Sequence, residues 1–253
     1  MSKNKILIVG YGNIGKHLHK ELAKLNPAIY DKFIPEHTET INDHYDISFI
    51  AVPTEMLPDG SADISAVENA VSVVDSEVIV IKSAVPVGTT DYLAEKYNKN
   101  IVISPEYYGT TQHSSDSPNF LILGGDKQHS RKVAQIYYNI KNGSFRIKFT
   151  DTKTAELAKY MENCFLALKV TFCCEFKEIS DSFGIIYEEL RELFIMDERM
   201  GDSHTFVYDD QPYYDSHCLN KDIPALIKFA DNPPLISKMD EINRSKKNRN
   251  EKS

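Results

Sequence analysis

Short runs of apolar residues alternate with longer amphipathic stretches along the first 150 positions of the chain. The run KILIV (5–9) is rich in β-branched residues and ends at a glycine, which is typical of a buried strand followed by a tight loop. The stretch HLHKELAKL (17–25) instead places Leu18, Leu22 and Leu25 on one face of a helix. Strands that run into loops are predicted in the same way at 28–31, 46–54, 76–90, 100–108 and 119–125, and further helices at 65–74 and 130–140.

Strands that alternate with helices indicate βα units, whose strands lie parallel in one sheet with helices on its two faces. The pattern changes at Thr152. Residues 152–182 contain neither proline nor glycine, which predicts one helix of roughly 45 Å. Shorter helices are predicted at 186–196 and 223–230. We therefore expect a Rossmann-like, doubly wound α/β domain at 1–150, a smaller all-helical domain with one long central helix at 151–243, and a disordered basic tail at 244–253.

Composition narrows the classes of function. The chain is 42% hydrophobic and 26% charged, as is ordinary for a globular protein, and its net charge of −8 argues against a general nucleic-acid binder. No apolar run approaches the roughly 18 residues that span a bilayer, so we expect no membrane segment. The four cysteines show no paired framework, which indicates reduced thiols in the cytoplasm. The histidines lack metal-ligand spacing, and no metal is expected.

The hexapeptide GYGNIG (10–15) stands between a predicted strand and a predicted helix, the context of a dinucleotide-binding loop. Its glycines allow a tight turn and close approach of a pyrophosphate to the helix N-terminus, although a purely structural glycine turn is the alternative. Asp31 follows about 20 residues later, where a carboxylate would accept both ribose hydroxyls and repel a 2′-phosphate. NAD is therefore favoured over NADP, less strongly because of Lys32. The expected cofactor residues are Gly10, Tyr11, Gly12, Asn13, Ile14, Gly15, Asp31 and Lys32.

Loops at the ends of the later strands would line the crevice at the carboxyl edge of the sheet, where ligands bind in such folds. They are AVPT (51–54), KSAVPVGTT (82–90) and SPEYYG (104–109), so Val52, Pro53, Thr54 and Ser83 are added to the cofactor residues. Glu106 follows a proline in the third loop. It is either a solvated loop carboxylate or a general base.

The long helix and the segment after it carry further candidates. Lys159 and Asn163 are four residues apart, hence on one helical face, where an ammonium and an amide could stabilise an oxyanion; in isolation Lys159 is better explained as a surface lysine. The segment SHCLNKDIPAL (216–226) is either a helix start capped by Asn220 or a nucleophilic thiol, Cys218, with Lys221 beside it to favour the thiolate.

Taken in order, these motifs resemble the UDP-glucose/GDP-mannose dehydrogenase family. The matching segments are GYGNIG, AVPT, KSAVPVGTT, SPEYYG, AELAKYMENCFLALKVTFCCEF and HCLNKD. The family oxidises the primary alcohol of a nucleotide sugar to a carboxylate with two NAD molecules. The resemblance implies a homodimer that uses a nucleotide-sugar substrate, in a pathway to surface polysaccharides.

The resemblance also implies a role for each matching residue. Asp222 and Lys159 help a water to deprotonate the alcohol as the first hydride leaves, and Cys218 then attacks the aldehyde. Lys159 and Asn163 stabilise the thiohemiacetal oxyanion, a second hydride transfer gives a thioester, and Glu106 assists its hydrolysis. Lys221 falls at a cofactor-binding position. The implied substrate contacts are Glu106, Tyr107, Lys159, Asn163 and, across the dimer, Arg199.

Departures from the family pattern leave alternatives open. Ala84 follows Ser83 where the family has a threonine, and YDDQPYYDSH (208–217) stands where the family has a glycine-rich loop that wraps the substrate. The chain stops near where the family's nucleotide-binding third domain would start, so that domain is expected to be absent, and whether a separate protein supplies it stays open. The alternatives are a non-catalytic NAD-binding dimer and a two-electron dehydrogenase of a smaller substrate with Cys218 as a packing residue.

Overall fold

The computed structural model describes residues 4–37, 41, 43–108, 118–141 and 143–251. They form two compact units. Unit 1 takes in the described residues within Met1–Glu55, Ala62–Thr110 and Ser115–Lys159, and unit 2 those within Met56–Ser61 and Tyr160–Ser253. The division, expected at residue 150, falls inside the long helix, because the side chain of Ala155 near the start of that helix is part of the core beneath the sheet of unit 1.

Unit 1 is built on a seven-stranded sheet with the order β2-β1-β3-β4-β5-β6-β7. Chain order and sheet order differ at β1, since the chain passes to β2 on one side and then returns to β3 on the other. The strands are β1 (Ile6–Val9), β2 (Ala28–Tyr30), β3 (Tyr45–Ile50), β4 (Ser76–Ile81), β5 (Ile101–Ile103), β6 (Phe120–Gly124) and β7 (Arg146–Thr150).

The sheet is parallel, as expected, except at one pairing. β1 to β5 are parallel, and so are β6 and β7, but β5 and β6 run antiparallel with Ile103 opposite Gly124. An apolar run has the same composition whichever way the strand points, so its direction is invisible in the hydrophobic pattern. The strand β7 was also not predicted. Its sequence RIKFT is largely exposed at the sheet edge and therefore lacks the apolar run of a buried strand.

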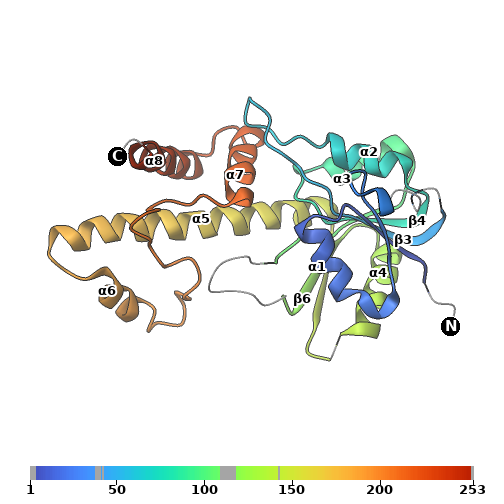
Figure 1. Cartoon of the computed structure of the whole chain (residues 1–253), viewed down its shortest axis with the longest axis horizontal. Helices are drawn as coiled ribbons and strands as arrows, with labels where there is room; N and C mark the ends of the chain where they lie inside the picture. The colour runs from blue at the N-terminus through green and yellow to red at the C-terminus, as the bar shows by residue number, and fades with distance from the viewer. Residues whose placement is uncertain (1–3, 38–40, 42, 109–117, 142, 252–253) are drawn as a thin grey trace. The chain divides into compact units, whose positions relative to one another are not determined.

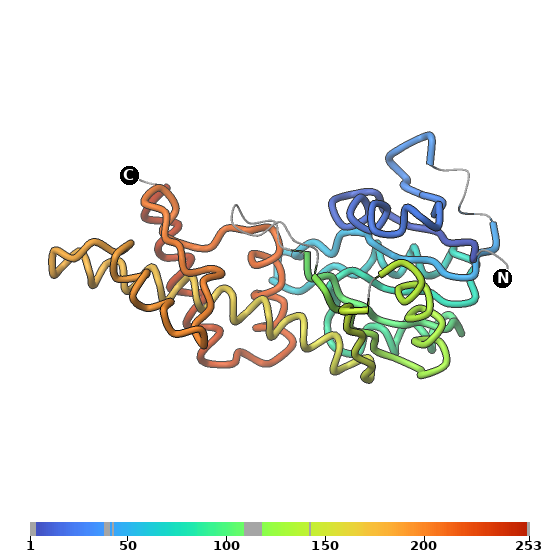
Figure 2. Tube along the Cα trace, turned by 90° about the horizontal axis from the view of Figure 1, so that it is seen from below, coloured from blue at the N-terminus to red at the C-terminus, as the bar shows by residue number. Residues whose placement is uncertain are grey.

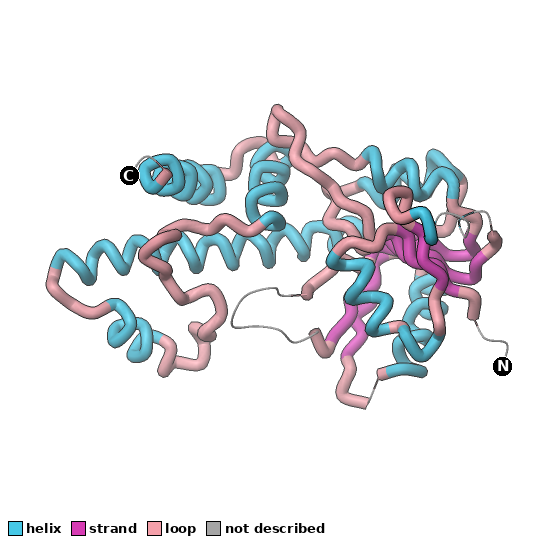
Figure 3. Tube along the Cα trace, in the orientation of Figure 1, coloured by secondary structure: helices cyan, strands magenta, loops and turns pink. Residues whose placement is uncertain are grey.

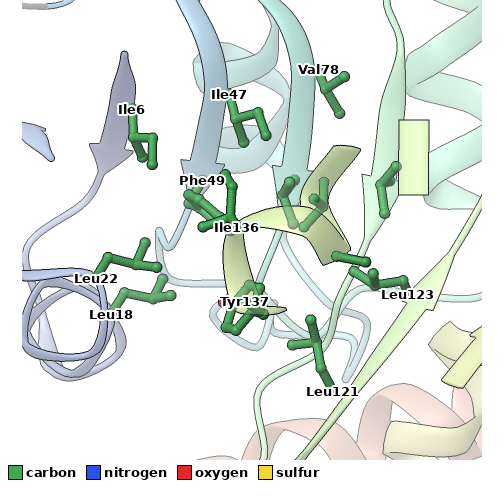
Figure 4. Packing of buried hydrophobic residues seen from close by; sticks show 14 of the residues in the cluster. Ile6, Leu18, Leu22, Ile47, Phe49, Val78, Leu121, Leu123, Ile136 and Tyr137 are labelled. Carbon is green, nitrogen blue, oxygen red and sulfur yellow. The ribbon is translucent and has the colours of Figure 1, made fainter. Parts of the chain in front are cut away.

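Helices cover both faces of this sheet, as predicted. Successive residues of β1 point to opposite faces, so Ile6 and Ile8 join one core cluster while Leu7 and Val9 join the other. The first cluster is covered by α1 (Asn13–Glu21) and α4 (Lys127–Ile140), and Figure 4 shows Leu18 of α1 and Tyr137 of α4 within it. The second cluster is covered by α2 (Ser65–Val73) and α3 (Thr89–Tyr97); two short 3₁₀ turns, η1 (Ala23–Leu25) and η2 (Pro35–His37), complete the described helical elements of unit 1.

The long helix α5 spans Thr152–Ser182, which confirms the prediction from the absence of proline and glycine. Its start is fixed in unit 1 by Glu156. The buried carboxylate of Glu156 accepts hydrogen bonds from the backbone N–H groups of Gly88 (2.6 Å) and Thr90 (2.8 Å). These are N-terminal amides of α3, whose own cap position is a glycine without a side chain to satisfy them.

Unit 2 contains the rest of α5 together with α6 (Tyr187–Phe194), α7 (His217–Phe229) and α8 (Pro234–Asn250) (Figure 1). Its described residues form helices and loops, while the strands belong to unit 1 (Figure 3). An irregular segment leads from α6 to α7 (Figure 2). Within the described residues, no helix has the length and apolar character needed to cross a membrane.

Two expectations for this region are corrected. The helix around Cys218 begins at His217, and its cap is Ser216, whose hydroxyl accepts from the N–H of Leu219, so Asn220 lies inside the helix. Residues 244–250, expected to be part of a disordered tail, are the last turns of α8. Their polar composition conceals a buried side chain, because Lys246 is 6% exposed and pairs with Glu178 of α5.

Candidate active site

The glycine loop GYGNIG occupies the turn between β1 and α1. Gly10 has φ +92°, and a Cβ on it would lie 2.6 Å from the carbonyl oxygen of Ala51; a Cβ on Gly15 would lie 2.0 Å from the oxygen of Gly10. These two glycines are therefore required by the chain's own packing. A Cβ on Gly12 would instead meet nothing within 4 Å. Gly12 also forms the N-terminal boundary of α1 without a capping side chain, which leaves both space and helix N–H groups for a pyrophosphate.

This loop lies at the point where the strand order reverses. β1 is paired with β2 on one side and with β3 on the other, and the loops that follow β1 and β3 leave from the same edge. The crevice between such diverging loops is where open α/β sheets bind ligands. The loop after β3 carries Val52, Pro53 and Thr54, which the sequence assigned to the cofactor site.

Asp31 is held directly beside the glycine loop, at the end of β2. Its Oδ2 accepts a 2.7 Å hydrogen bond from the N–H of Tyr11, and its Oδ1 accepts a 2.9 Å bond from the N–H of Phe33. The ammonium of Lys32 lies 4.8 Å from the ring centroid of Phe33. The residues present thus fit a dinucleotide. Asp31 lies beside the glycine loop at the end of the second strand, where a carboxylate can accept hydrogen bonds from the ribose hydroxyls.

Two hydroxyl groups brace the loops after β3 and β4. Thr54 Oγ1 donates to the carbonyl oxygen of Ala84 (2.9 Å), and Ser83 Oγ donates to that of Val52 (2.6 Å). Both side chains are 2% exposed. Their hydroxyl protons are used in hydrogen bonds between the two loops. Ser83 and Thr54 therefore fix the position of the loops that line the crevice.

Glu106 is a carboxylate that is only 10% exposed and has a charged partner, so it is not a solvated loop residue. Its Oε1 accepts from the N–H groups of Tyr107 (2.7 Å) and Tyr108 (3.0 Å), while its Oε2 lies 3.4 Å from Lys82 Nζ. Lys82 is 3% exposed and also donates to Ser104 Oγ at 3.2 Å. Lys82 was missed by the sequence reasoning, although a lysine placed directly after the buried strand SEVIVI is a recognisable signal.

A small cavity of about 10 Å³ lies against Glu106 and Lys82, with Glu21 and Tyr108 among its other lining residues. That volume is near the minimum for one water molecule. The hydroxyl of Tyr108 donates to Glu21 on α1 (2.8 Å), and its ring stacks on His17, also on α1, at 4.7 Å. Burial, reinforced by the charges of Glu106 and Glu21, raises the pKa of Tyr108, which keeps this hydroxyl a donor. The loop that carries Glu106 is thereby tied to the helix of the glycine loop.

Lys159 also belongs to this unit. Its ammonium lies 4.6 Å from the ring centroid of Tyr107, in the geometry of a cation–π contact. The structure therefore brings together Glu106, Tyr107 and Lys159, three of the implied substrate contacts.

A second group of candidate residues lies in unit 2. Asp222 on α7 is 3% exposed, and its Oδ2 accepts a 2.7 Å hydrogen bond from Asn163 Nδ2 on α5. Its Oδ1 pairs with the ammonium of Lys221 at 2.6 Å. Cys218 lies four residues before Asp222, hence one turn away on the same helical face, and its side chain is exposed.

The other thiols differ from Cys218 in burial. Cys164, next to Asn163, is buried, and burial together with the charge of Asp222 raises its pKa to about 12. Burial likewise raises the pKa of Cys173, and that of Cys174 to about 11. These three thiols stay protonated near neutral pH, as expected for core residues.

Arg199 lies in the irregular segment between α6 and α7 and pairs within that segment. Its guanidinium is 83% exposed and forms an ion pair with Asp197. The loop behind it is anchored by Lys169 of α5, whose Nζ donates to the carbonyl oxygens of Met200 (3.2 Å) and Gly201 (3.1 Å). Among the described residues, no cluster of three or more histidine, cysteine, aspartate or glutamate side chains could hold a metal ion.

The fold and the glycine loop define a dinucleotide-binding protein of the Rossmann type. Residues 32–141 match the model of the UDP-glucose/GDP-mannose dehydrogenase family NAD binding domain, and residues 153–245 match that of the family's central domain. The chain belongs to this family, and its cofactor is NAD.

Individual relatives agree with this assignment. The chain is 30% identical over 215 residues to the UDP-glucose 6-dehydrogenase of Rickettsia bellii (79% of this chain, 49% of the relative). It is 30% identical over 203 residues to that of Rhizobium meliloti (73% and 46%). The fold is similar to the solved UDP-glucose dehydrogenase of Pyrobaculum islandicum, with a TM-score of 0.79 and 23% identity over 96% of this chain and 68% of that one. The chain spans about half the length of the curated relatives it matches.

Proposed function

We propose that the protein oxidises the primary alcohol of a nucleotide sugar to a carboxylate, with NAD as oxidant and Cys218 as nucleophile. The observation that carries this proposal is the buried hydrogen bond from Asn163 to Asp222, one helical turn from the exposed thiol of Cys218. It supports the proposal because an amide donor, a carboxylate and a thiol lie in one small region of unit 2. The family to which the chain belongs supplies the reaction class.

Bound NAD accepts a hydride in each of the two oxidation steps. In the first, Asp222 takes the proton of the alcohol through a water, and Lys159 supports the transfer. Each carboxylate oxygen of Asp222 can accept two hydrogen bonds, so the contacts with Asn163 and Lys221 leave positions for that water. The product of this half of the reaction is an aldehyde.

In the second half, the thiolate of Cys218 adds to the aldehyde carbon and the carbonyl oxygen becomes an oxyanion. Asn163 has two N–H donors, of which one is directed at Asp222. The other stabilises that oxyanion, and the positive charge of Lys159 adds to the stabilisation. Loss of hydride turns the adduct into a thioester of Cys218. Water then cleaves the thioester, with Glu106 positioned by Lys82 as the supporting carboxylate, and the thiol is released.

We further propose that the protein acts as a homodimer paired through α5. Along this helix Met161, Phe165, Phe172 and Phe176 are 75%, 60%, 45% and 40% exposed. Their spacing of four, seven and four positions places these side chains on one face of α5, as in a helix that packs on a second helix. Arg199, exposed on its own chain, would then contact the substrate of the partner chain.

A two-electron dehydrogenase of a smaller substrate is the second candidate. It is supported by the segment 208–217, whose bulky and acidic residues replace glycines. The side chain of Asp209, for example, is 91% exposed and would repel a diphosphate. In either case the exposed, reduced Cys218 fits a reaction that takes place in the cytoplasm.

The decisive experiment measures NADH by its absorbance at 340 nm, with NAD and a panel of UDP-, GDP- and TDP-sugars. The wild type is compared with Cys218→Ala, and Cys173→Ala serves as the control at a buried thiol. Two NADH per sugar in the wild type and in Cys173→Ala, but no more than one in Cys218→Ala, supports the four-electron reaction. One NADH per substrate in the wild type, unchanged in Cys218→Ala, would favour the second candidate. NAD binding without any NADH would indicate a non-catalytic NAD-binding module.

A further inference from the structure

Tyr214 lies two positions before Ser216, the cap of α7. Both its main chain and its side chain are hydrogen-bonded to α8. The N–H of Tyr214 donates to Asn243 Oδ1 (2.8 Å), and its carbonyl oxygen accepts from Asn243 Nδ2 (3.0 Å). Its hydroxyl donates to Asp240 Oδ1 (2.9 Å). Tyr214 and Asn243 are each 4% exposed. In this buried position the side chain of Asn243 makes the two hydrogen bonds to the Tyr214 main chain that a neighbouring strand could otherwise make.

The contacts continue on both sides of Tyr214. Asp215 Oδ1 accepts from Lys247 Nζ (2.6 Å) and from Asn220 Nδ2 (2.7 Å), and Asn250 Nδ2 donates to the carbonyl oxygen of Asp210 (2.8 Å). The α8 residues in these contacts are Asp240, Asn243, Lys247 and Asn250. Their spacing of three, four and three positions puts them on one face of the helix. That face of α8 is therefore directed at the segment 210–215.

This segment leads directly into the first turn of α7. Ser216 caps the helix, and Cys218 is its second residue. Any change in the direction of the chain at Tyr214 and Asp215 would move the cap, and with it the first helical turn that carries Cys218. A glycine-rich segment could be ordered by its ligand, whereas this one is held in place by its own chain.

We propose that the Asp240–Asn243–Lys247–Asn250 face of α8 is a latch that positions Cys218 by holding residues 210–215 in place before substrate binds. The latch residues are positioning residues, since they act on the reaction through the first turn of α7. The inference deepens the proposed function and rests on it for its catalytic meaning. The contacts themselves are independent of any substrate.

The test uses the full chain and two readouts that need neither NAD nor sugar. The first is the rate at which iodoacetamide modifies Cys218, followed by peptide mass spectrometry; Cys164, Cys173 and Cys174 are buried and serve as internal references. The second is amide hydrogen exchange over residues 216–220. The variants are Asn243→Ala, which removes both main-chain contacts, and Asn243→Asp, which keeps the acceptor for the Tyr214 N–H. Lys238→Ala is the control, because this exposed α8 residue pairs with Glu241 outside the latch.

In Asn243→Ala the first turn of α7 should open more often, so that its amides exchange about tenfold faster. Alkylation of Cys218 at pH 7 should slow by about two- to fivefold, because the thiolate loses the aligned helix N–H groups. The slowing should vanish near pH 10, where the thiol ionises in every variant; a mere change in access would persist there. Asn243→Asp should lie between the wild type and Asn243→Ala, and Lys238→Ala should match the wild type.

Unchanged exchange and unchanged alkylation in a folded Asn243→Ala would overturn the latch. A variant that only unfolds at lower denaturant, with Cys218 reacting as before, would do the same, since that describes a structural contact. If Asn243→Ala does not fold, Lys247→Met cuts the more exposed arm of the latch and is judged by the same two rates. A chain that oxidises no sugar still gives both rates, so failure of the proposed function and failure of the latch are told apart.

Discussion

The side-chain amide of Asn163 donates to the buried carboxylate of Asp222 across 2.7 Å, although the two residues lie 59 positions apart on different helices. This bond fixes the register of α7 against α5. Because Cys218 is one turn before Asp222, the same bond determines which part of α5 faces the side of α7 that bears the thiol. The motifs on α5 and α7 are far apart in the sequence, and this contact holds them together in space.

Replacing Asn163 by alanine should lower the free energy of unfolding by about 1–3 kcal/mol, because Asp222 would lose a donor in a buried position. Urea denaturation at pH 7 measures the change. Asn163→Asp should be at least as destabilising, since it sets a second carboxylate against Asp222. If the proposed reaction is correct, Asn163→Ala should also slow turnover by about 10²–10³-fold. Equal stability of wild type and Asn163→Ala would contradict the structural part.

Lys82 and Glu106 should behave as a coupled pair, since their side chains are 3% and 10% exposed. Lys82→Met leaves the Glu106 carboxylate without its charge partner and should destabilise the protein by about 3–5 kcal/mol. Glu106→Gln in the same chain should restore part of that loss. A double-mutant cycle in urea should give a coupling of about 0.5–3 kcal/mol. Strict additivity of the two single changes would show that the residues act independently.

The elements that the sequence predicted share a property: each is specified by neighbours along the chain. The strand KILIV and its glycine loop are local patterns, and so is the uninterrupted helix from Thr152 to Ser182. The loop residues Glu106 and Ser83 could be assigned to the carboxyl edge of the sheet for the same reason. Their neighbours in the sequence already place them after a strand.

What escaped prediction depends on partners far away in the chain. Lys82 matters because Glu106 lies beside it, and Asn243 matters because it binds Tyr214, 29 positions earlier. Residues 244–250 look like a solvated tail until the buried contact of Lys246 with Glu178 is known. The direction of β6 and the presence of the exposed strand β7 are likewise set by sheet pairing, which leaves no trace in the hydrophobic pattern.

Gly12 and Gly15 should respond differently to the same change. Gly12→Ala should fold with nearly unchanged stability, because its Cβ would meet nothing within 4 Å, yet it should weaken NAD binding by filling the space left for the pyrophosphate. Gly15→Ala should be strongly destabilised, since its Cβ would lie 2.0 Å from the oxygen of Gly10. Thermal unfolding and NAD titration calorimetry separate the two effects. NAD affinity equal to that of the wild type in Gly12→Ala would count against this binding mode.

The Asp215–Lys247 pair should give a pH-dependent contribution to stability. Burial alone would raise the pKa of Asp215, but hydrogen bonds from Lys247 and Asn220 outweigh it and hold the pKa below 3.8. The contribution is therefore fully present above pH 3.8 and is lost as the pH falls through the lower folded value. The carboxylate of Asp215 raises the pKa of Lys247 above 10.5, so on the alkaline side the contribution is lost only as the pH rises through that higher value.

The variant that checks this is Asp215→Asn. Compared with the wild type it should be less stable by about 0.2–1 kcal/mol, by the same amount from pH 5 to pH 9. Urea midpoints measured down to pH 2.5 should converge for the two proteins. A difference that grows as the pH falls would mean that the Asp215 carboxyl is not stabilised in its charged form.

The apolar stripe on α5 leads to a prediction about assembly. Met161 and Phe176 are 75% and 40% exposed and lie 15 residues apart along the helix, a distance of about 22 Å. Burying such a stripe against a second copy removes these large apolar side chains from water, whereas a monomer would leave them exposed. We therefore expect the wild type to sediment as a dimer at micromolar concentration.

Phe165→Glu, which sets a charge in the middle of the stripe, should shift the protein to monomer without unfolding it, because this side chain is already 60% exposed in the single chain. Phe33→Glu is the matched control, since Phe33 is an 81% exposed aromatic residue of unit 1 outside the stripe. Analytical ultracentrifugation of the three proteins decides the question. A monomeric wild type, or a Phe165→Glu protein that stays dimeric, would remove α5 as the interface, and Arg199 would then have no route to the site of a partner chain.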